Sequence, residues 1–178
     1  ENTSGPLGQG HTMAVGAAIA ERFLAARFGR LFEHRIYSYI SDGGIQEEIS
    51  QGAGRLAGHL GLSNLVMFYD SNDIQLSTET RAVNCEDTAM KYRSWGWEVV
   101  TIDGNDHDQI RKALSAAVKS QDKPFLIIGK TIMGKGLLDN EGNSFERKTS
   151  THGMPVGEAG GSYEKSLVNL GGDISNPF

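Results

Sequence analysis

Two short polar segments carry residue types that bind a divalent cation. Asp42 and two glycines follow the apolar run at residues 36–40. Asn72 follows the apolar run at residues 65–69, thirty positions after Asp42. Mg²⁺ and Ca²⁺ prefer oxygen ligands, and Mg²⁺ usually combines one or two protein oxygens with phosphate oxygens and water. The carboxylate of Asp42 and the amide oxygen of Asn72 therefore predict a site for a metal ion and a phosphate.

Neighbouring backbone groups extend this prediction. The carbonyl of Ile74 lies in the same turn as Asn72 and supplies a third oxygen. Gly43 and Gly44 leave room for a phosphate beside the amide groups that open the next helix, whose dipole favours negative charge. An ordinary turn is the alternative interpretation of each segment, because Asp is a common helix cap.

Strands and helices that alternate along the chain must position these segments. Apolar runs predict strands at residues 36–40, 65–69, 97–102 and 124–128. Composition and helical spacing predict helices at residues 13–28, 45–60, 86–95, 107–119 and 163–170. The helix at 45–60 is expected to bury one face, and Gly61 is predicted to end it. The apolar residues of that face are Ile45, Ile49, Ala53, Ala57 and Leu60.

This alternation predicts the α/β fold class, with right-handed crossovers and a mostly parallel sheet between two helical layers. Ligands of such sheets bind at the carboxyl ends of the strands, which is where Asp42 and Asn72 lie. The length of 178 residues is that of one domain, so we expect a single domain over residues 1–178.

Composition excludes several classes of protein. The net charge of −5 argues against nucleic acid as a partner, because binding to its phosphates relies on clustered Lys and Arg. The longest apolar runs are far shorter than the roughly 20 residues of a membrane span, and no secretory leader is visible. A lone cysteine, Cys85, excludes an internal disulfide framework and is typical of a reducing compartment. We therefore expect a cytoplasmic protein with no membrane partner.

Longer segments resemble the transketolase family, in register over about residues 5–157. The Asp-Gly pair followed some thirty residues later by Asn is shared by many thiamine-diphosphate enzymes. The segments at residues 5–10 and 151–157 narrow the resemblance to transketolase and its close relatives. The segments that carry it are residues 5–10, 41–50, 56–62, 68–74, 87–90, 96–97, 130–134 and 151–157.

The resemblance implies the thiamine-diphosphate-binding fold, with thiamine diphosphate as the cofactor and Mg²⁺ or Ca²⁺ holding its diphosphate. The metal ligands it implies are Asp42, Asn72 and the carbonyl of Ile74. The positions that match the family's cofactor-binding residues are Gly5, Pro6, Leu7, Asp42, Gly43, Asn72, Ile74 and His152.

Activity and assembly are also implied by the resemblance. The family transfers a two-carbon ketol unit from a ketose phosphate to an aldose phosphate in the pentose phosphate pathway, so phosphorylated sugars are the expected substrates. His152 matches a catalytic histidine close to the diphosphate and the sugar. Glu47 matches a carboxylate buried at the interface of a homodimer, in a network that joins the two cofactor sites.

Three positions depart from the family pattern. Ser41 replaces the first glycine of the signature, Asp73 replaces a glycine after the metal-binding Asn, and Gln51-Gly52 replaces a His-Glu pair. None of them removes a ligand, but Asp73 adds negative charge or forces a different turn. Outside the motifs, the basic residues of the helices are expected to be solvated: Lys91, Arg93, Lys112 and Lys119.

We expect the chain to be most of the diphosphate- and metal-binding domain of a transketolase. The family's pyrimidine-binding domain is absent from these residues, so it is expected from a second subunit or a missing chain segment, and the chain alone is expected to be inactive. Two alternatives remain open. One is another thiamine-diphosphate enzyme, such as a deoxyxylulose-phosphate synthase or dihydroxyacetone synthase, and the other is a non-catalytic half-domain that dimerises without binding cofactor.

Overall fold

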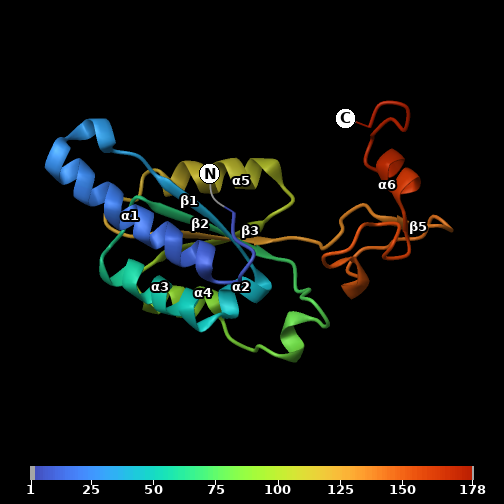
Figure 1. Cartoon of the computed structure of the whole chain (residues 1–178), viewed down its shortest axis with the longest axis horizontal. Coiled ribbons are helices and arrows are strands. Elements are labelled where there is room, and N and C mark those ends of the chain that lie inside the picture. The colour runs from blue at the N-terminus through green and yellow to red at the C-terminus, as the bar shows by residue number, and fades with distance from the viewer. Residues whose placement is uncertain (1–2, 178) are drawn as a thin grey trace. The chain divides into compact units, whose positions relative to one another are not determined.

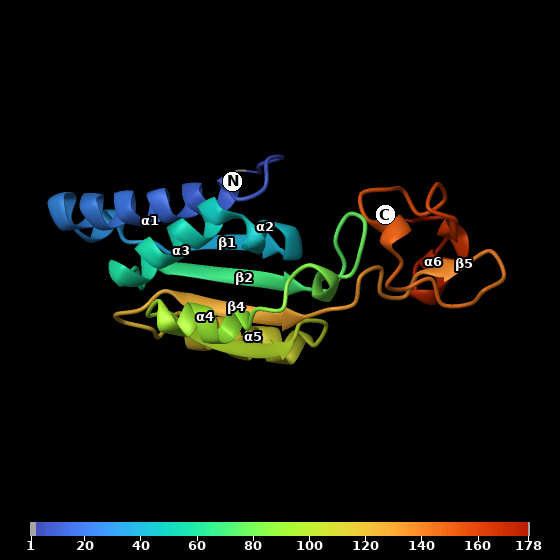
Figure 2. The same ribbon diagram turned by 90° about the horizontal axis from the view of Figure 1, so that it is seen from below.

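Four parallel strands form the central sheet of the protein. A computed structural model describes residues 3–177. The strands are β1 (Ile36–Ser41), β2 (Leu65–Ser71), β3 (Glu98–Asp103) and β4 (Phe125–Lys130). Their order across the sheet is β1-β2-β4-β3, and all three pairings are parallel (Figure 2). The predicted α/β class and parallel sheet are confirmed.

Helices cover both faces of this sheet (Figure 1). On one face, α1 (Gln9–Phe28), α3 (Glu48–His59) and α4 (Thr88–Ser94) pack against a core that includes Leu65 and Met67. On the other face, α5 (His107–Ala117) packs through Ala113 and Ala117 against Phe125 and Ile127. The alternating side chains of the strands thus supply two separate cores, as expected for a sheet covered on both sides.

The predicted helix at residues 45–60 is two helices. A single turn, α2 (Asp42–Gln46), precedes α3, and Glu47 between them has extended backbone angles (φ −61°, ψ 132°). The break changes which side chains are buried: Ile45 is 4% exposed, as expected, but Ile49 is 53% exposed. Gly61, with φ +57°, follows the last turn of α3, and the amide of Leu62 donates to the Ala57 carbonyl (3.1 Å). The predicted helix end at Gly61 is therefore confirmed.

Two compact units make up the chain. Unit 1 consists of Glu1–Ser71 and Glu86–Lys130 and contains the sheet and helices α1 to α5, and unit 2 consists of Asn72–Cys85 and Thr131–Phe178. Unit 2 is mostly turns and includes the two-stranded antiparallel sheet of β5 (Leu138–Asp139) and β6 (Gly161–Ser162). A single domain over residues 1–178 stays a prediction.

Short helices complete both units. The predicted final helix is confirmed as α6 (Tyr163–Asn169) in unit 2. Single 3-10 turns occur at Arg30–Phe32, Thr80–Ala82 and Thr149–Thr151. Within residues 3–177, no helix has both the length and the apolar character needed to cross a bilayer.

Candidate functional site

Asp42 is a buried carboxylate at the carboxyl end of β1. It is the first residue of α2, directly after Ser41 ends the strand, and it is 1% exposed. The hydroxyl of Tyr69 in β2 donates a hydrogen bond of 2.6 Å to Asp42 Oδ1. Because a buried carboxylate is costly without polar neighbours, this bond both stabilises the carboxylate and fixes its orientation.

The turn after β1 accommodates the departure at Ser41. Its hydroxyl oxygen accepts a hydrogen bond of 3.3 Å from the amide of Gly44, so Ser41 is the N-cap of α2. The helix that begins here has only five residues. A macrodipole grows with the number of aligned peptides, so the large dipole expected from a four-turn helix is not present at this turn.

The loop before α1 lies beside this turn. Gly5, Pro6 and Leu7 are exposed, and a Cβ atom at Gly43 would lie 3.2 Å from Leu7 Cδ1. Gly8 follows with φ +83° and packs closely against Ile49 at the start of α3. Unit 1 therefore brings Gly43, the neighbour of Asp42 in sequence, close to Leu7.

Asn72 and Ile74 come together in unit 2. Asn72 follows the last residue of β2, and the two side chains are 7% and 2% exposed. The backbone amide of Ile74 donates a hydrogen bond of 3.0 Å to Asn72 Oδ1, which orients the amide group and fixes the turn. An amide oxygen is a neutral donor of the kind that Mg²⁺ and Ca²⁺ accept.

Asp73, between them, adopts the left-handed conformation that the family's glycine would adopt readily. Its φ is +65°, and Asp tolerates this region better than most residues. Arg147 Nη2 lies 3.9 Å from Asp73 Oδ2. The added negative charge therefore has a cation beside it within unit 2.

His152 follows the 3-10 turn Thr149–Thr151 in unit 2. Its backbone amide donates to the Thr149 carbonyl (3.1 Å), which holds the residue at the end of the turn. Its Nδ1 atom is buried and, within residues 3–177, has no hydrogen-bond partner. The hydrogen-bonding capacity of this ring nitrogen is therefore not used by residues 3–177.

Tyr69 is the residue of this region that sequence reasoning missed. The sequence pattern shows it only as part of an apolar run, although its hydroxyl reaches the key carboxylate. The available signal was its place near the carboxyl end of a strand beside β1, where the register pairs Tyr69 with Ile40. A tyrosine buried at such a position requires a polar partner.

Comparisons with known proteins agree on one family. The family model described as "Transketolase, thiamine diphosphate binding domain" matches residues 1–178. The chain is 41% identical to transketolase 2 of Xanthobacter flavus over 162 residues, covering 88% of this chain and 23% of that protein. It is 42% identical to transketolase 2 of Escherichia coli over 163 residues, covering 89% of this chain and 24% of that protein.

Solved structures agree with the sequence relatives. The transketolase from Leishmania mexicana superposes with a TM-score of 0.85 at 34% identity, covering 96% of this chain and 25% of that one. The Pichia stipitis transketolase solved with sedoheptulose-7-phosphate superposes with a TM-score of 0.84 at 30% identity, covering 98% of this chain and 25% of that one. The chain thus spans about a quarter of the length of the relatives it matches.

Proposed function

Because the chain belongs to the transketolase family, we propose that it supplies the diphosphate- and metal-binding part of a transketolase. The observation that carries the proposal is the buried carboxylate of Asp42 at the carboxyl end of a parallel strand, in a region that matches a thiamine-diphosphate-binding domain. Ligands of parallel sheets bind at this edge.

The proposed metal ligands are the Asp42 carboxylate, the Asn72 amide oxygen and the Ile74 carbonyl. One carboxylate with two neutral oxygens fits Mg²⁺ or Ca²⁺, which take hard oxygen donors and complete their shell with phosphate oxygens and water. The buried and hydrogen-bonded state of Asp42 and Asn72 supports this assignment. Tyr69 would hold the first ligand and the Ile74 amide the second.

The remaining proposed contacts surround the diphosphate. Gly43 has no side chain to obstruct it, and Gly5, Pro6 and Leu7 form the adjoining loop. We assign to His152 a hydrogen bond to a diphosphate or sugar oxygen, since its buried Nδ1 has no partner among residues 3–177. Thiamine diphosphate, when bound, supplies the stabilisation of negative charge on carbon, and the protein positions and polarises.

For the whole protein, the proposal is transfer of a two-carbon ketol unit between phosphorylated sugars in the pentose phosphate pathway. The Pichia stipitis relative was solved with sedoheptulose-7-phosphate, which supports sugar phosphates as the substrate class. The chain spans about a quarter of its relatives, so a pyrimidine-binding domain from a second subunit or another segment belongs to the proposal. The proposed compartment is the cytoplasm.

A homodimer is the proposed assembly. An apolar groove of about 370 Å³ runs between α1 and α3 in unit 1, and its lining includes Ile19, Ile49 and Leu56. These three side chains are 38%, 53% and 45% exposed. Glu47, also exposed, is the N-cap of α3, two residues before Ile49, and is the residue proposed to join the interface.

Calorimetry with thiamine diphosphate and Mg²⁺ tests the cofactor assignment. We expect binding that EDTA abolishes, and Asp42→Asn should weaken it by at least about 100-fold, because loss of even a supporting group of a metal ligand costs roughly 10- to 100-fold. Asn keeps an acceptor for Tyr69, so the fold should survive. Asp122→Asn, an exposed control, should bind like the wild type.

Two results would contradict the proposal. Absence of binding heat in the wild-type chain would favour a half-domain that holds no cofactor. Equal affinity of Asp42→Asn and the wild type would show that the metal ligand lies elsewhere. Circular dichroism of each variant separates loss of binding from loss of fold.

A further inference from the structure

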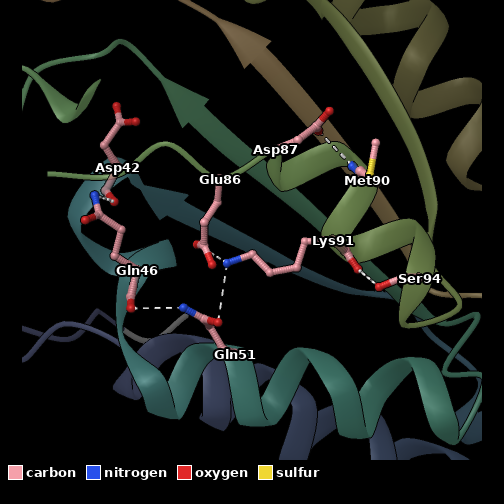
Figure 3. Close-up of polar contacts among 8 residues, drawn as sticks. All are labelled: Asp42, Gln46, Gln51, Glu86, Asp87, Met90, Lys91 and Ser94. Atoms are coloured by element: carbon pink, nitrogen blue, oxygen red, sulfur yellow. Dashed lines mark hydrogen bonds and ion pairs between the residues drawn. The ribbon is translucent and has the colours of Figure 1, made fainter. Parts of the chain in front are cut away.

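Lys91 in α4 holds its charge inside unit 1, contrary to the solvated position expected from sequence. Its side chain is 17% exposed and forms an ion pair with the Glu86 carboxylate. Its Nζ atom also donates to Gln51 Oε1 in α3 (3.4 Å; Figure 3). The same atom lies 5.9 Å from the centre of the Trp95 ring. These three contacts prevent the ammonium group from turning out to solvent.

From Lys91, a chain of hydrogen bonds reaches the residue proposed as the metal ligand. Gln51 Nε2 donates to the Gln46 carbonyl at the end of α2 (3.2 Å). Gln46 Nε2 in turn donates to the Asp42 carbonyl at the start of the same helix (2.8 Å). Figure 3 shows the series running from α4 through α3 to α2.

The chemistry of the end groups fixes the direction of this chain. A lysine ammonium has only donors, and a backbone carbonyl has only acceptor sites. Gln51 must therefore turn Oε1 toward Lys91 and Nε2 toward Gln46. The positive charge also polarises the Gln51 amide and strengthens its bond to Gln46, as expected for charge-assisted and cooperative hydrogen bonds.

Helix α2 needs such support. It has five residues, and a helix of one turn has too few internal hydrogen bonds to persist without external contacts. Ser41 caps its first turn, and Gln51 binds the carbonyl of its last residue. The position of Asp42 therefore depends on both ends of the turn being held.

We propose that Lys91 is a positioning residue for Asp42, which acts by orienting Gln51 so that it clamps the carboxyl end of α2. Lys91 is not among the proposed ligands of the metal or the diphosphate, and its own contacts are with Glu86, Gln51 and Trp95. The assignment of a ligand to α2 rests on the proposed function, whereas the clamp itself is independent of it. The ligand that Asp42 would bind in this position is a divalent cation with the diphosphate of the cofactor.

Hydrogen exchange of the 178-residue chain without ligand tests the clamp. In Lys91→Met, amides of residues 42–47 should exchange about tenfold faster, which is the effect of losing one or two supporting hydrogen bonds. Lys91→Arg keeps a cationic donor and should remain within about twofold of wild type. Lys112→Met, an exposed lysine on α5, is the matched control and should not change this segment.

A double variant separates the clamp from a general effect of Lys91 on α4. If Lys91 acts through Gln51, then Lys91→Met combined with Gln51→Leu should exchange no faster at residues 42–47 than Gln51→Leu alone, because coupled residues are not additive. Additive acceleration, or unchanged exchange in Lys91→Met, would overturn the proposal.

Calorimetry with Mg²⁺ and thiamine diphosphate then tests the link to binding. Lys91→Met should weaken binding by about tenfold, and Lys91→Arg should restore it. If the wild type gives no heat while Lys91→Met loosens α2, the clamp stands and the proposed function fails. If the wild type and Lys91→Met bind equally although α2 is loosened, the positioning role toward the ligand is overturned.

Discussion

Among individual residues, the site depends on how buried polar groups are satisfied. Asp42 accepts a hydrogen bond from the Tyr69 hydroxyl, and Asn72 accepts one from the Ile74 amide. Ser41, which replaces the family's glycine, caps the turn after β1. Each bond is made by a neighbour that also fixes the orientation of the proposed ligand or its turn. Within each unit, the side-chain oxygen of the proposed ligand is therefore oriented by a hydrogen bond from the protein, which lowers the cost of ordering that side chain on binding.

His11 is a buried residue with a predicted effect on stability. It is 3% exposed in α1, and neither ring nitrogen has a hydrogen-bond partner within residues 3–177. Burial disfavours the charged ring and lowers the pKa of His11 to about 4, from 6.5. The unfolded chain therefore binds the additional proton between these two pH values, and the free energy of unfolding should fall as the pH decreases from about 6.5 to about 4.

We expect His11 to account for at most about 3 kcal/mol of this loss, since one pKa unit corresponds to about 1.4 kcal/mol. His11→Leu should keep the core filled and flatten the dependence in this window. Urea unfolding of the wild type and of His11→Leu at several pH values measures the pH dependence of the free energy of unfolding. A His11→Leu variant with the wild-type pH dependence would assign the acid sensitivity to other groups.

The position of Asp42 and Asn72 directly after two strands could be predicted from sequence, because apolar runs show where the strands end; that they are metal ligands stays a prediction. The supporting contacts could not be predicted from sequence. Tyr69 belongs to a sequence pattern typical of an apolar strand, and Lys91 to one typical of a solvated helix. Only the packing of separate elements turns the polar atoms of these two side chains inward.

Among the helices and strands, the break at Glu47 shows a limit of periodicity. Ile45, Ile49 and Ala53 continue one helical pattern through the break. However, Gly8 at the start of α1 packs against Ile49 and Glu47. In addition, the Gln51 side chain donates a hydrogen bond to the carbonyl of the last residue of α2. Both contacts join segments that a local pattern does not relate, so tertiary packing overrides the local preference for one helix.

Close packing of α3 predicts a contrast between two of its glycines. A Cβ atom at Gly58 would lie 1.8 Å from the Trp95 carbonyl oxygen, which is backbone and cannot move without shifting the connection to β3. Gly58→Ala should therefore lower the free energy of unfolding by about 1–3 kcal/mol, the usual cost of overpacking. Urea unfolding measures the change.

Gly52→Ala in the same helix is the control. A Cβ atom there would have no neighbour within 4 Å. Alanine is the better helix former, so this variant should be more stable than wild type by roughly 0.5–1 kcal/mol. Similar effects of the two substitutions would mean that the approach of α3 to Trp95 is looser than described.

For the whole molecule, the regular alternation of strands and helices could be predicted from sequence. The parallel direction of the strands follows from right-handed crossovers, so the parallel sheet and its two helical layers were predicted, whereas the strand order β1-β2-β4-β3 was not. Unit 2 was not, because its structure is built from turns rather than periodic segments. Asp139, for example, accepts bonds from the amides of Glu141 and Asn143.

The proposed homodimer gives a prediction about assembly. Sedimentation should show a concentration-dependent dimer, and Leu56→Asp should weaken it by at least about tenfold by placing a charge in the apolar groove between α1 and α3. Val118→Asp alters a similarly exposed apolar residue at the end of α5, on the opposite face of the sheet, and should leave the dimer intact. A wild-type chain that stays monomeric at every concentration would refute this assembly.

The strand order also has a consequence for synthesis on the ribosome. Among the strands formed by residues 3–177, β3 pairs only with β4, and β4 lies between β2 and β3. A nascent polypeptide that has emerged only as far as residue 120 therefore carries β3 with no strand to join, and its core lacks Leu126 and Ile128 of β4. Completion of the sheet waits for the release of Lys130 from the exit tunnel, and until then this stretch is a target for the chaperones that bind emerging chains.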